Sequence, residues 1–173
     1  MKQFSSQSWE DINGIEVFPF DRLQPDQQQA VAQSIADYTQ AQAETEKIVA
    51  VEPQTVLHKQ LAHVALKHGE VIGYVGAGDP VQHGKFSMTQ VGTLCVWPEH
   101  RGNTIGYRLV KGLTTDLRRM GQHPYAFCNP RRIKVFREAC YVDVTPDKLP
   151  PDAFSPFGNQ AMAVTVSRCG RLV

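Results

Sequence analysis

The hydrophobic pattern changes its period most clearly between residues 91 and 121. Residues 91–97 are mostly apolar and β-branched, which is typical of a buried strand, and Pro98 ends that run. Beyond Asn103 the apolar residues recur every three or four positions, which places them on one helix face. They are Ile105, Leu109, Leu113, Leu117 and Met120. Because Gly121 follows at a typical helix end, this segment predicts a strand, a short loop and an amphipathic helix.

The rest of the pattern predicts further short elements on both sides of this segment. The expected strands are 15–20, 61–67, 70–77, 124–128, 141–144 and 161–168, and the expected helices are 25–40 and about 130–139. Residues 40–56 are polar, and their composition is compatible with either a second short helix or a mobile segment. Residues 78–86 and 145–159 are expected to be loops. Alternation of strands and helices in this order indicates an α/β fold with a mixed sheet.

Composition narrows the class of protein. The chain has 173 residues, of which 42% are hydrophobic and 20% charged, so we expect one globular domain over residues 1–173. The formal net charge of +1 gives no reason to expect nucleic acid or an anionic membrane as a partner. The N-terminal residues contain no signal-peptide core, and no run approaches the roughly 20 apolar residues of a membrane span.

The four cysteines, Cys95, Cys128, Cys140 and Cys169, are scattered along the chain. No pair has the spacing of a zinc site or a redox dithiol, so no metal is expected. We expect reduced and mostly buried thiols in a cytoplasmic protein.

The loop before the amphipathic helix is the candidate binding site. The first backbone N–H groups of a helix lack partners within it, and together with the helix dipole they attract anions. Gly102 and Gly106 leave room for phosphate oxygens to reach these amides. A plain strand-to-helix turn also uses glycine, so the spacing alone leaves both interpretations open.

The run Val96-x-Pro98-x-x-Arg101-Gly102-x-x-Ile105-Gly106 resembles the acetyl-CoA site of the GNAT N-acetyltransferase superfamily. The family signature is Q/R-x-x-G-x-G/A, and Thr104 stands here in place of its first glycine. The resemblance implies a GNAT fold, with a mixed and mostly antiparallel sheet flanked by helices. Thr104 matters to the cofactor site if this position needs a positive φ, or if its Cβ would touch the pyrophosphate.

A second family signature, N-x-x-A-x-x-x-Y-x-x-x-G-F, is matched less well. Asn129 fits, whereas Arg132 replaces the alanine, Phe136 the tyrosine and Cys140-Tyr141 the Gly-Phe pair. The resemblance gives Asn129 a contact with the pantetheine arm of acetyl-CoA, and a helix N-cap is the alternative. The implied cofactor-binding residues are Leu94, Cys95, Val96, Arg101, Gly102, Asn103, Thr104, Ile105, Gly106, Asn129 and Phe136.

Acetyl transfer to an amine needs a polarised thioester, a deprotonated amine and a stabilised leaving thiolate. By resemblance the Val96 N–H would bind the thioester carbonyl. Thr93 stands where many members carry a basic glutamate, and could only hold a water. Phe136 cannot donate the proton of the tyrosine it replaces, which leaves Tyr125, Tyr141 or water. The catalytic groups therefore stay unknown, with Thr93 and Tyr141 as weak candidates.

We interpret the chain as an acyltransferase that moves the acetyl group of acetyl-CoA to a small-molecule or peptide amine by direct attack in a ternary complex. A non-catalytic CoA-binding or regulatory module on the same fold is the alternative, favoured by Thr93 and Phe136. A structural domain without a CoA site, favoured by Thr104, is a third interpretation. The C-terminal strand could pair with a second copy, so a homodimer stays open.

Overall fold

The computed structural model describes residues 14–46, 48–59, 61–102, 104–153, 155 and 160–163. Its strands are β1 (Ile15–Pro19), β2 (Ala62–Lys67), β3 (Glu70–Ala77), β4 (Val81–His83), β5 (Phe86–Val96), β6 (Gln122–Cys128), β7 (Val142–Asp143) and β8 (Gln160–Ala163). Its α-helices are α1 (Pro25–Glu46), α2 (Pro53–Leu57), α3 (Ile105–Arg119) and α4 (Ile133–Glu138). Short 3-10 helices span Phe20–Arg22, Pro98–His100 and Pro146–Lys148.

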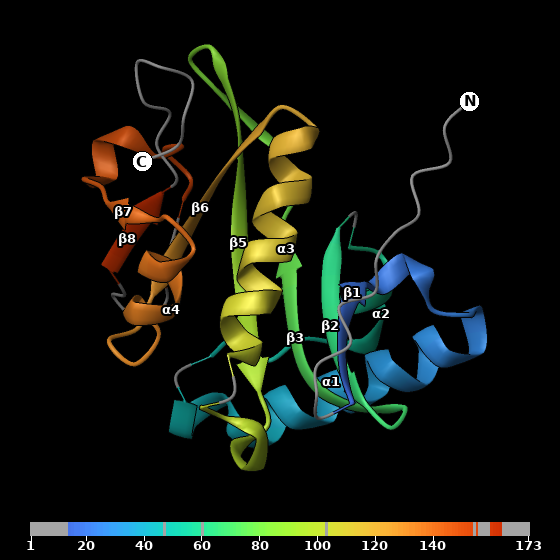
Figure 1. Ribbon diagram of the computed structural model, residues 1–173. Coiled ribbons are helices and arrows are strands. Elements are labelled where there is room, and N and C mark those ends of the chain that lie inside the picture. The colour runs from blue at the N-terminus through green and yellow to red at the C-terminus, as the bar shows by residue number, and fades with distance from the viewer. Residues whose placement is uncertain are drawn as a thin grey trace.

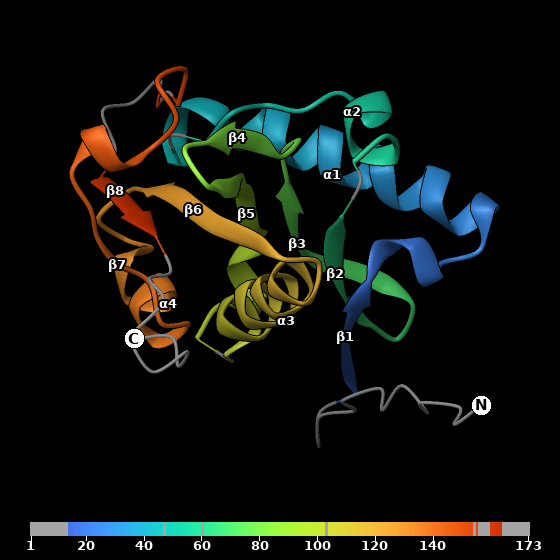
Figure 2. The ribbon, with the colours of Figure 1, turned by 90° about the horizontal axis from the view of Figure 1, so that it is seen from above.

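The eight strands form one mixed sheet in the order β1-β2-β3-β5-β6-β8-β7, and β4 pairs with β5 beside this path. All the pairings are antiparallel except that of β5 with β6. Helices α3 and α4 cover one face of the sheet, and α1 and α2 cover the other (Figures 1 and 2). The expected α/β fold with a mixed, mostly antiparallel sheet is confirmed.

The alternation of side chains along each strand divides the core between the two faces. On β2, Val64 and Leu66 pack with the α1 face while Ala65 packs with the α3 face. Four of the five predicted inner residues of α3 are buried: Ile105, Leu109, Leu113 and Leu117. The fifth, Met120, is 57% exposed because the helix ends at Arg119. Gly121 follows with φ +75°, as its position at the helix end predicts.

Several element boundaries differ from the sequence prediction. Helix α1 runs six residues past the expected end at Gln40, and residues 53–57 form the short helix that the polar stretch left open. The expected loop 78–86 contains β4, and β5 begins at Phe86 instead of Val91. The strand expected over 141–144 is only Val142–Asp143. Residues 164–168 of the expected closing strand lie outside the described residues.

The parallel strands β5 and β6 separate part of the way along their length. Their register joins Ser87–Gln90 to Gln122–Tyr125 and, among the described residues, does not continue along the rest of either strand. A β-bulge in β5 lies close to this point, because Gly76 pairs with Gly92 while Tyr74 pairs with Cys95. Thr93, inside the bulge, has φ +54°. The fold therefore opens the centre of its sheet beside the N-terminus of α3 (Figure 1).

Candidate active site

A cleft of about 450 Å³ lies where β5 and β6 separate. Its walls come from the end of β5, the loop and first turn of α3, the turn before α4 and the C-terminus of α1. The lining residues are Glu46, Leu94, Val96, His100, Arg101, Gly102, Thr104, Ile105, Gly106, Tyr107, Asn129, Arg131, Arg132, Lys134, Val135 and Glu138. This volume lies within the usual range of small-molecule sites.

Most of the predicted cofactor residues meet in this cleft. Eight of them line it: Leu94, Val96, Arg101, Gly102, Thr104, Ile105, Gly106 and Asn129. Cys95 and Phe136 do not; Cys95 is buried on the α1 face, and Phe136 packs edge-on against Tyr141 with ring centroids 5.0 Å apart. Asn103 lies outside the described residues. The loop and the strand thus come together as predicted, whereas two of the predicted side chains face the core.

The N-terminus of α3 is open toward the cleft. The amides of Ile105, Gly106 and Tyr107 begin the helix and have no acceptor within it. The Thr104 side chain makes no capping hydrogen bond, so it does not compete for these amides. A Cβ on Gly106 would lie 3.6 Å from Val135, so alanine fits here but a large side chain would enter the cleft.

Thr104 occupies a left-handed backbone conformation with φ +60°, and Gly102 has φ +83°. The position that the family signature fills with glycine, and that Thr104 fills here, therefore has a positive φ in this structure. A β-branched residue is uncommon there, and left-handed geometry costs an L-residue roughly 1–2 kcal/mol. The substitution leaves the amides of α3 free and introduces strain in the loop.

The backbone of Val96 faces the cleft. Trp97 N donates to Ile72 O at 2.9 Å, so the polar groups of Trp97 face β3 and those of Val96 point the opposite way, toward β6. The Val96 carbonyl accepts a hydrogen bond from Nε of Arg101 at 2.9 Å, which fixes this orientation. The Val96 N–H is therefore a backbone donor on the same side of the strand as the cleft.

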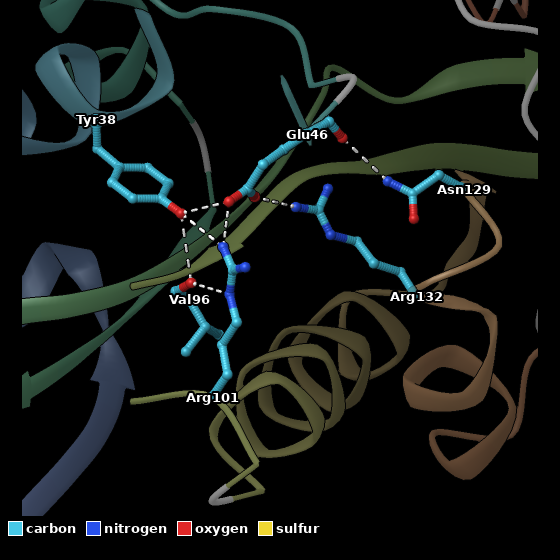
Figure 3. A network of polar contacts seen from close by, with 6 residues as sticks. All are labelled: Tyr38, Glu46, Val96, Arg101, Asn129 and Arg132. Carbon is cyan, nitrogen blue, oxygen red and sulfur yellow. Dashed lines mark hydrogen bonds and ion pairs between the residues drawn. The ribbon is translucent and has the colours of Figure 1, made fainter. Parts of the chain in front are cut away.

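A buried carboxylate connects three walls of the cleft (Figure 3). Glu46, the last residue of α1, accepts hydrogen bonds from Arg101 on Oε1 and from Arg132 on Oε2, the latter at 3.1 Å. The Tyr38 hydroxyl donates to Oε1 at 3.1 Å, and Asn129 Nδ2 donates to the Glu46 carbonyl at 3.3 Å. Only 8% of the Glu46 side chain is exposed. We call Tyr38, Glu46, Arg101 and Arg132 the Glu46 network.

Burial and charge act against each other in this network. Burial lowers the pKa of Arg132 below its ordinary value, and for Arg101 the hydrogen bond and charge of Glu46 outweigh burial and raise the pKa. Burial, then the charge of Glu46, raises the pKa of Tyr38 to about 12. Both arginines keep their charge at neutral pH. The network therefore brings two cations and one anion together in the cleft, with Glu46 and Arg132 largely shielded from water and Arg101 partly exposed.

The side chains considered for catalysis are not all in the cleft. Tyr141 is 1% exposed and its hydroxyl is 2.9 Å from that of Thr114, so it belongs to the core. Thr93 lies in the bulge and does not line the cleft. His100, a titratable residue of the loop before α3, does line it. Burial raises the pKa of the Cys95 and Cys128 thiols to about 12, which disfavours an acyl-cysteine route.

The residues present fit an anionic thioester such as acetyl-CoA. Arg131 and Lys134 add exposed positive charge beside the open amides of α3. Asn129 Oδ1 is buried without a hydrogen-bond partner among the described residues, and so it can accept one from a ligand. No group of three His, Cys, Asp or Glu suited to a metal is present in the described part of the chain. Its helices include none long and apolar enough to cross a membrane.

Asn129 is not the N-cap that sequence analysis offered as its alternative role. Helix α4 begins at Ile133 and has Arg132 at its N-cap, while the side chain of Asn129 holds the end of α1. Glu46 was missed because the helix was expected to end at Gln40. A signal was present, since a glutamate near a helix C-terminus opposes the helix dipole and suggests a cationic partner.

Comparison with known proteins identifies the family and the fold. The sequence model of the acetyltransferase (GNAT) family matches residues 27–140, well over half of the chain, and the chain belongs to this family. It is an acetyltransferase-family protein with the GNAT fold. No curated protein sequence matches the chain.

Solved structures of the same fold share little sequence with this chain. A Staphylococcus aureus Mu50 acetyltransferase of the GNAT family has a TM-score of 0.64 at 12% identity, covering 86% of this chain and 97% of that one. YncA from Salmonella typhimurium, a putative acetyltransferase solved with its cofactor acetyl-CoA, has a TM-score of 0.60 at 19% identity. The match covers 87% of this chain and 91% of that one. The catalytic domain of a Tetrahymena histone acetyltransferase, in complex with coenzyme A, has a TM-score of 0.59 at 12% identity. The match covers 86% of this chain and 90% of that one. At such identities the likeness shows the fold alone.

Proposed function

We propose that this protein transfers the acetyl group of acetyl-CoA to an amine by direct attack in a ternary complex. The observation that carries the proposal is the single cleft that joins the open N-terminus of α3 to the inward-facing backbone of Val96. Acetyl-CoA would supply an activated thioester. Membership of the acetyltransferase family supports the acyl donor, and the amine acceptor is our inference.

The residues of the cleft would divide the work between them. The amides of Ile105, Gly106 and Tyr107 would hold phosphate oxygens, with Arg131 and Lys134 adding positive charge nearby. The Val96 N–H would donate to the thioester carbonyl and stabilise the negative charge that develops there. Holding donor and acceptor together would supply much of the acceleration.

Deprotonation of the amine is the more difficult requirement. A lysine-like ammonium has a pKa near 10.4, so at pH 7 only about 1 molecule in 2,500 is neutral. Thr93 cannot act as a base, and of the three titratable residues His83, Glu99 and His100 it is His100 that lines the cleft. We therefore expect the reaction rate to rise with pH, as the neutral fraction of the acceptor grows.

The acceptor would be a small-molecule or peptide amine. A homodimer remains a proposal that size measurement in solution would test. We also propose a cytoplasmic location, supported by the free thiols of Cys95, Cys128 and Cys140 in the described residues.

The second candidate function is a CoA-binding or regulatory module without turnover. It is favoured by the bulge position of Thr93 and by the burial of both Phe136 and Tyr141, which removes the usual places for a base and an acid. Both functions predict that acetyl-CoA binds, so binding does not separate them.

Turnover separates the two functions. The protein is incubated with acetyl-CoA and a panel of primary amines, including amino acids, polyamines and lysine peptides, and release of free CoA thiol is followed. We expect one class of amine to accelerate release in a saturable way, with the acetylated amine detected by mass. Binding of acetyl-CoA with no acceleration by any amine class would favour the module instead.

A further inference from the structure

The departing sulfur is the part of the proposed reaction for which no group has yet been assigned. When the amine forms its C–N bond, the C–S bond breaks and its electron pair stays on sulfur. The resulting thiolate needs either a proton or a fixed positive charge beside it. The aromatic side chains Phe136 and Tyr141 are buried in the core and cannot serve it.

Arg132 is the best shielded cation of the cleft. It stands at the N-cap of α4, and its side chain reaches Glu46 Oε2 at 3.1 Å. Its side chain is 20% exposed, against 43% for Arg101 and 86% for Lys134. A charge held away from water acts more strongly on its neighbours than an exposed one. Of these three cations, Arg132 is therefore the one whose charge is least screened by water.

Glu46 does not neutralise the charges around it. Arg101 and Arg132 contribute two positive charges and Glu46 one negative charge, so one positive charge remains in the network. Tyr38, whose pKa is raised to about 12, stays neutral at physiological pH. A partly buried network with one uncompensated positive charge favours an anion beside it.

The charge of Arg132 also acts on the end of β5. Cys95 precedes the inward-facing Val96 on β5, and its pKa is raised to about 12 by burial. Among the groups that act in the opposite direction, Arg132 has the largest effect. Cys95 faces α1 and not the cleft, so this effect shows that the Arg132 guanidinium lies within electrostatic range of the end of β5.

We propose that Arg132 stabilises the leaving thiolate of acetyl-CoA, so that the sulfur departs as an ion-paired thiolate and not as a protonated thiol. The acceptor nitrogen loses its proton to solvent, and CoA takes up a proton after it leaves. Glu46 acts as a positioning residue that holds the Arg132 side chain toward the cleft. This inference rests on the proposed function, because it requires CoA in the cleft.

The ionisation of bound CoA tests the proposal without relying on turnover. Free CoA is titrated by its thiolate absorbance in the ultraviolet, and the titration is repeated with CoA bound to the wild-type protein, to Arg132→Met and to Arg137→Met. Arg137 lies on the same helix but pairs with Asp143 outside the cleft, so its substitution is the matched control for loss of charge. Binding of CoA to each protein is first measured by calorimetry.

We expect the bound thiol to have a pKa at least one unit below that of free CoA, a tenfold rise in the ratio of thiolate to thiol. Arg132→Met should abolish most of that shift, and Arg137→Met should keep it. If Arg132→Met does not fold or bind, Arg132→Lys replaces it and should retain part of the shift.

An unshifted thiol in wild-type protein, or a full shift in Arg132→Met, would overturn the role of Arg132 and leave the proposed function standing. Absence of CoA binding to the wild-type protein would instead refute the proposed function.

Discussion

Glu46 and Arg132 meet across the opening between β5 and β6, with Oε2 of the carboxylate 3.1 Å from Nη2 of the guanidinium. The first residue ends α1 on one face of the sheet, and the second precedes α4 on the other face (Figure 3). Arg101 binds the other oxygen of the same carboxylate. A single side chain therefore ties the helix on the α1 face to the two segments expected to hold the cofactor.

Glu46→Gln should destabilise the protein. Removing one partner of a buried ion pair leaves the other charge poorly compensated. Because Arg101 is partly exposed to water, we expect a loss in the free energy of unfolding at the lower end of the usual range, about 3 kcal/mol. Glu138→Gln is the matched control, since Glu138 also lines the cleft but forms an exposed pair with Lys134 at 3.9 Å. It should cost less than about 1 kcal/mol. Equal losses in the free energy of unfolding for the two variants, measured in urea, would show that the Glu46 network stabilises the protein no more than an exposed ion pair does.

Thr104→Gly should stabilise the loop before α3. Thr104 has φ +60°, and relief of that strain, about 1–2 kcal/mol, exceeds the roughly 0.5–1 kcal/mol by which glycine loosens the unfolded chain. The expected net gain in the free energy of unfolding is up to about 1 kcal/mol, measured by chemical denaturation. A loss of about 1 kcal/mol would mean that the Thr104 side chain contributes a stabilising contact.

Gly112→Ala should be harmful although alanine is the better helix former. A Cβ at Gly112 would lie 2.8 Å from Cε1 and Nδ1 of His63, a ring that Asp116 holds through a 2.9 Å hydrogen bond. We expect a loss of about 1–3 kcal/mol from this overpacking. Gly106→Ala in the same helix, whose nearest contact would be 3.6 Å, should be neutral or stabilising. Similar changes in Tm for the two variants would contradict the expected clash with His63.

Asp116 should give the protein a pH-dependent contribution to stability. Its hydrogen bond with His63 holds the carboxyl pKa below the ordinary value, against the opposing effect of burial. Because the folded pKa is depressed, the stabilisation is complete above pH about 4 and is lost as pH falls through the folded pKa. Asp116→Asn should cost about 1.5 kcal/mol at pH 7. The difference should shrink below pH 4, and a constant difference would exclude this linkage.

The features that could be predicted from the sequence are those whose interacting residues lie close together along the chain. The end of β5, the loop and α3 were predicted well because their signals lie within one continuous segment, residues 91–121. The Glu46 network was not predicted, since Glu46 is 55 residues from Arg101 and 86 from Arg132. Cys95 and Phe136 were assigned to the cofactor by their place in a motif, and the structure shows that both side chains face the core. Motif position fixes the backbone better than it fixes where a side chain points.

The backbone conformation of Thr104 could not be predicted from the sequence. The residue type at this position was known to matter if φ were positive, and only the structure supplies φ +60°. The start of α4 is a similar case. Asn129-Pro130 is a good helix start by composition, yet the contact of Asn129 with the Glu46 carbonyl holds that residue outside the helix. In both places tertiary contacts decide between locally acceptable conformations.

The central claim is that acetyl-CoA binds in the cleft between β5, α3 and α4, and thermal unfolding with the ligand tests it most directly. At about 100 times the dissociation constant, binding to the folded state should add roughly 2.7 kcal/mol. We predict a clear rise in Tm for the wild-type protein and for Gly106→Ala, and none for Gly106→Trp, whose side chain would enter the cleft beside Val135. An unchanged Tm in wild-type protein, or an undiminished rise in Gly106→Trp, would contradict the account.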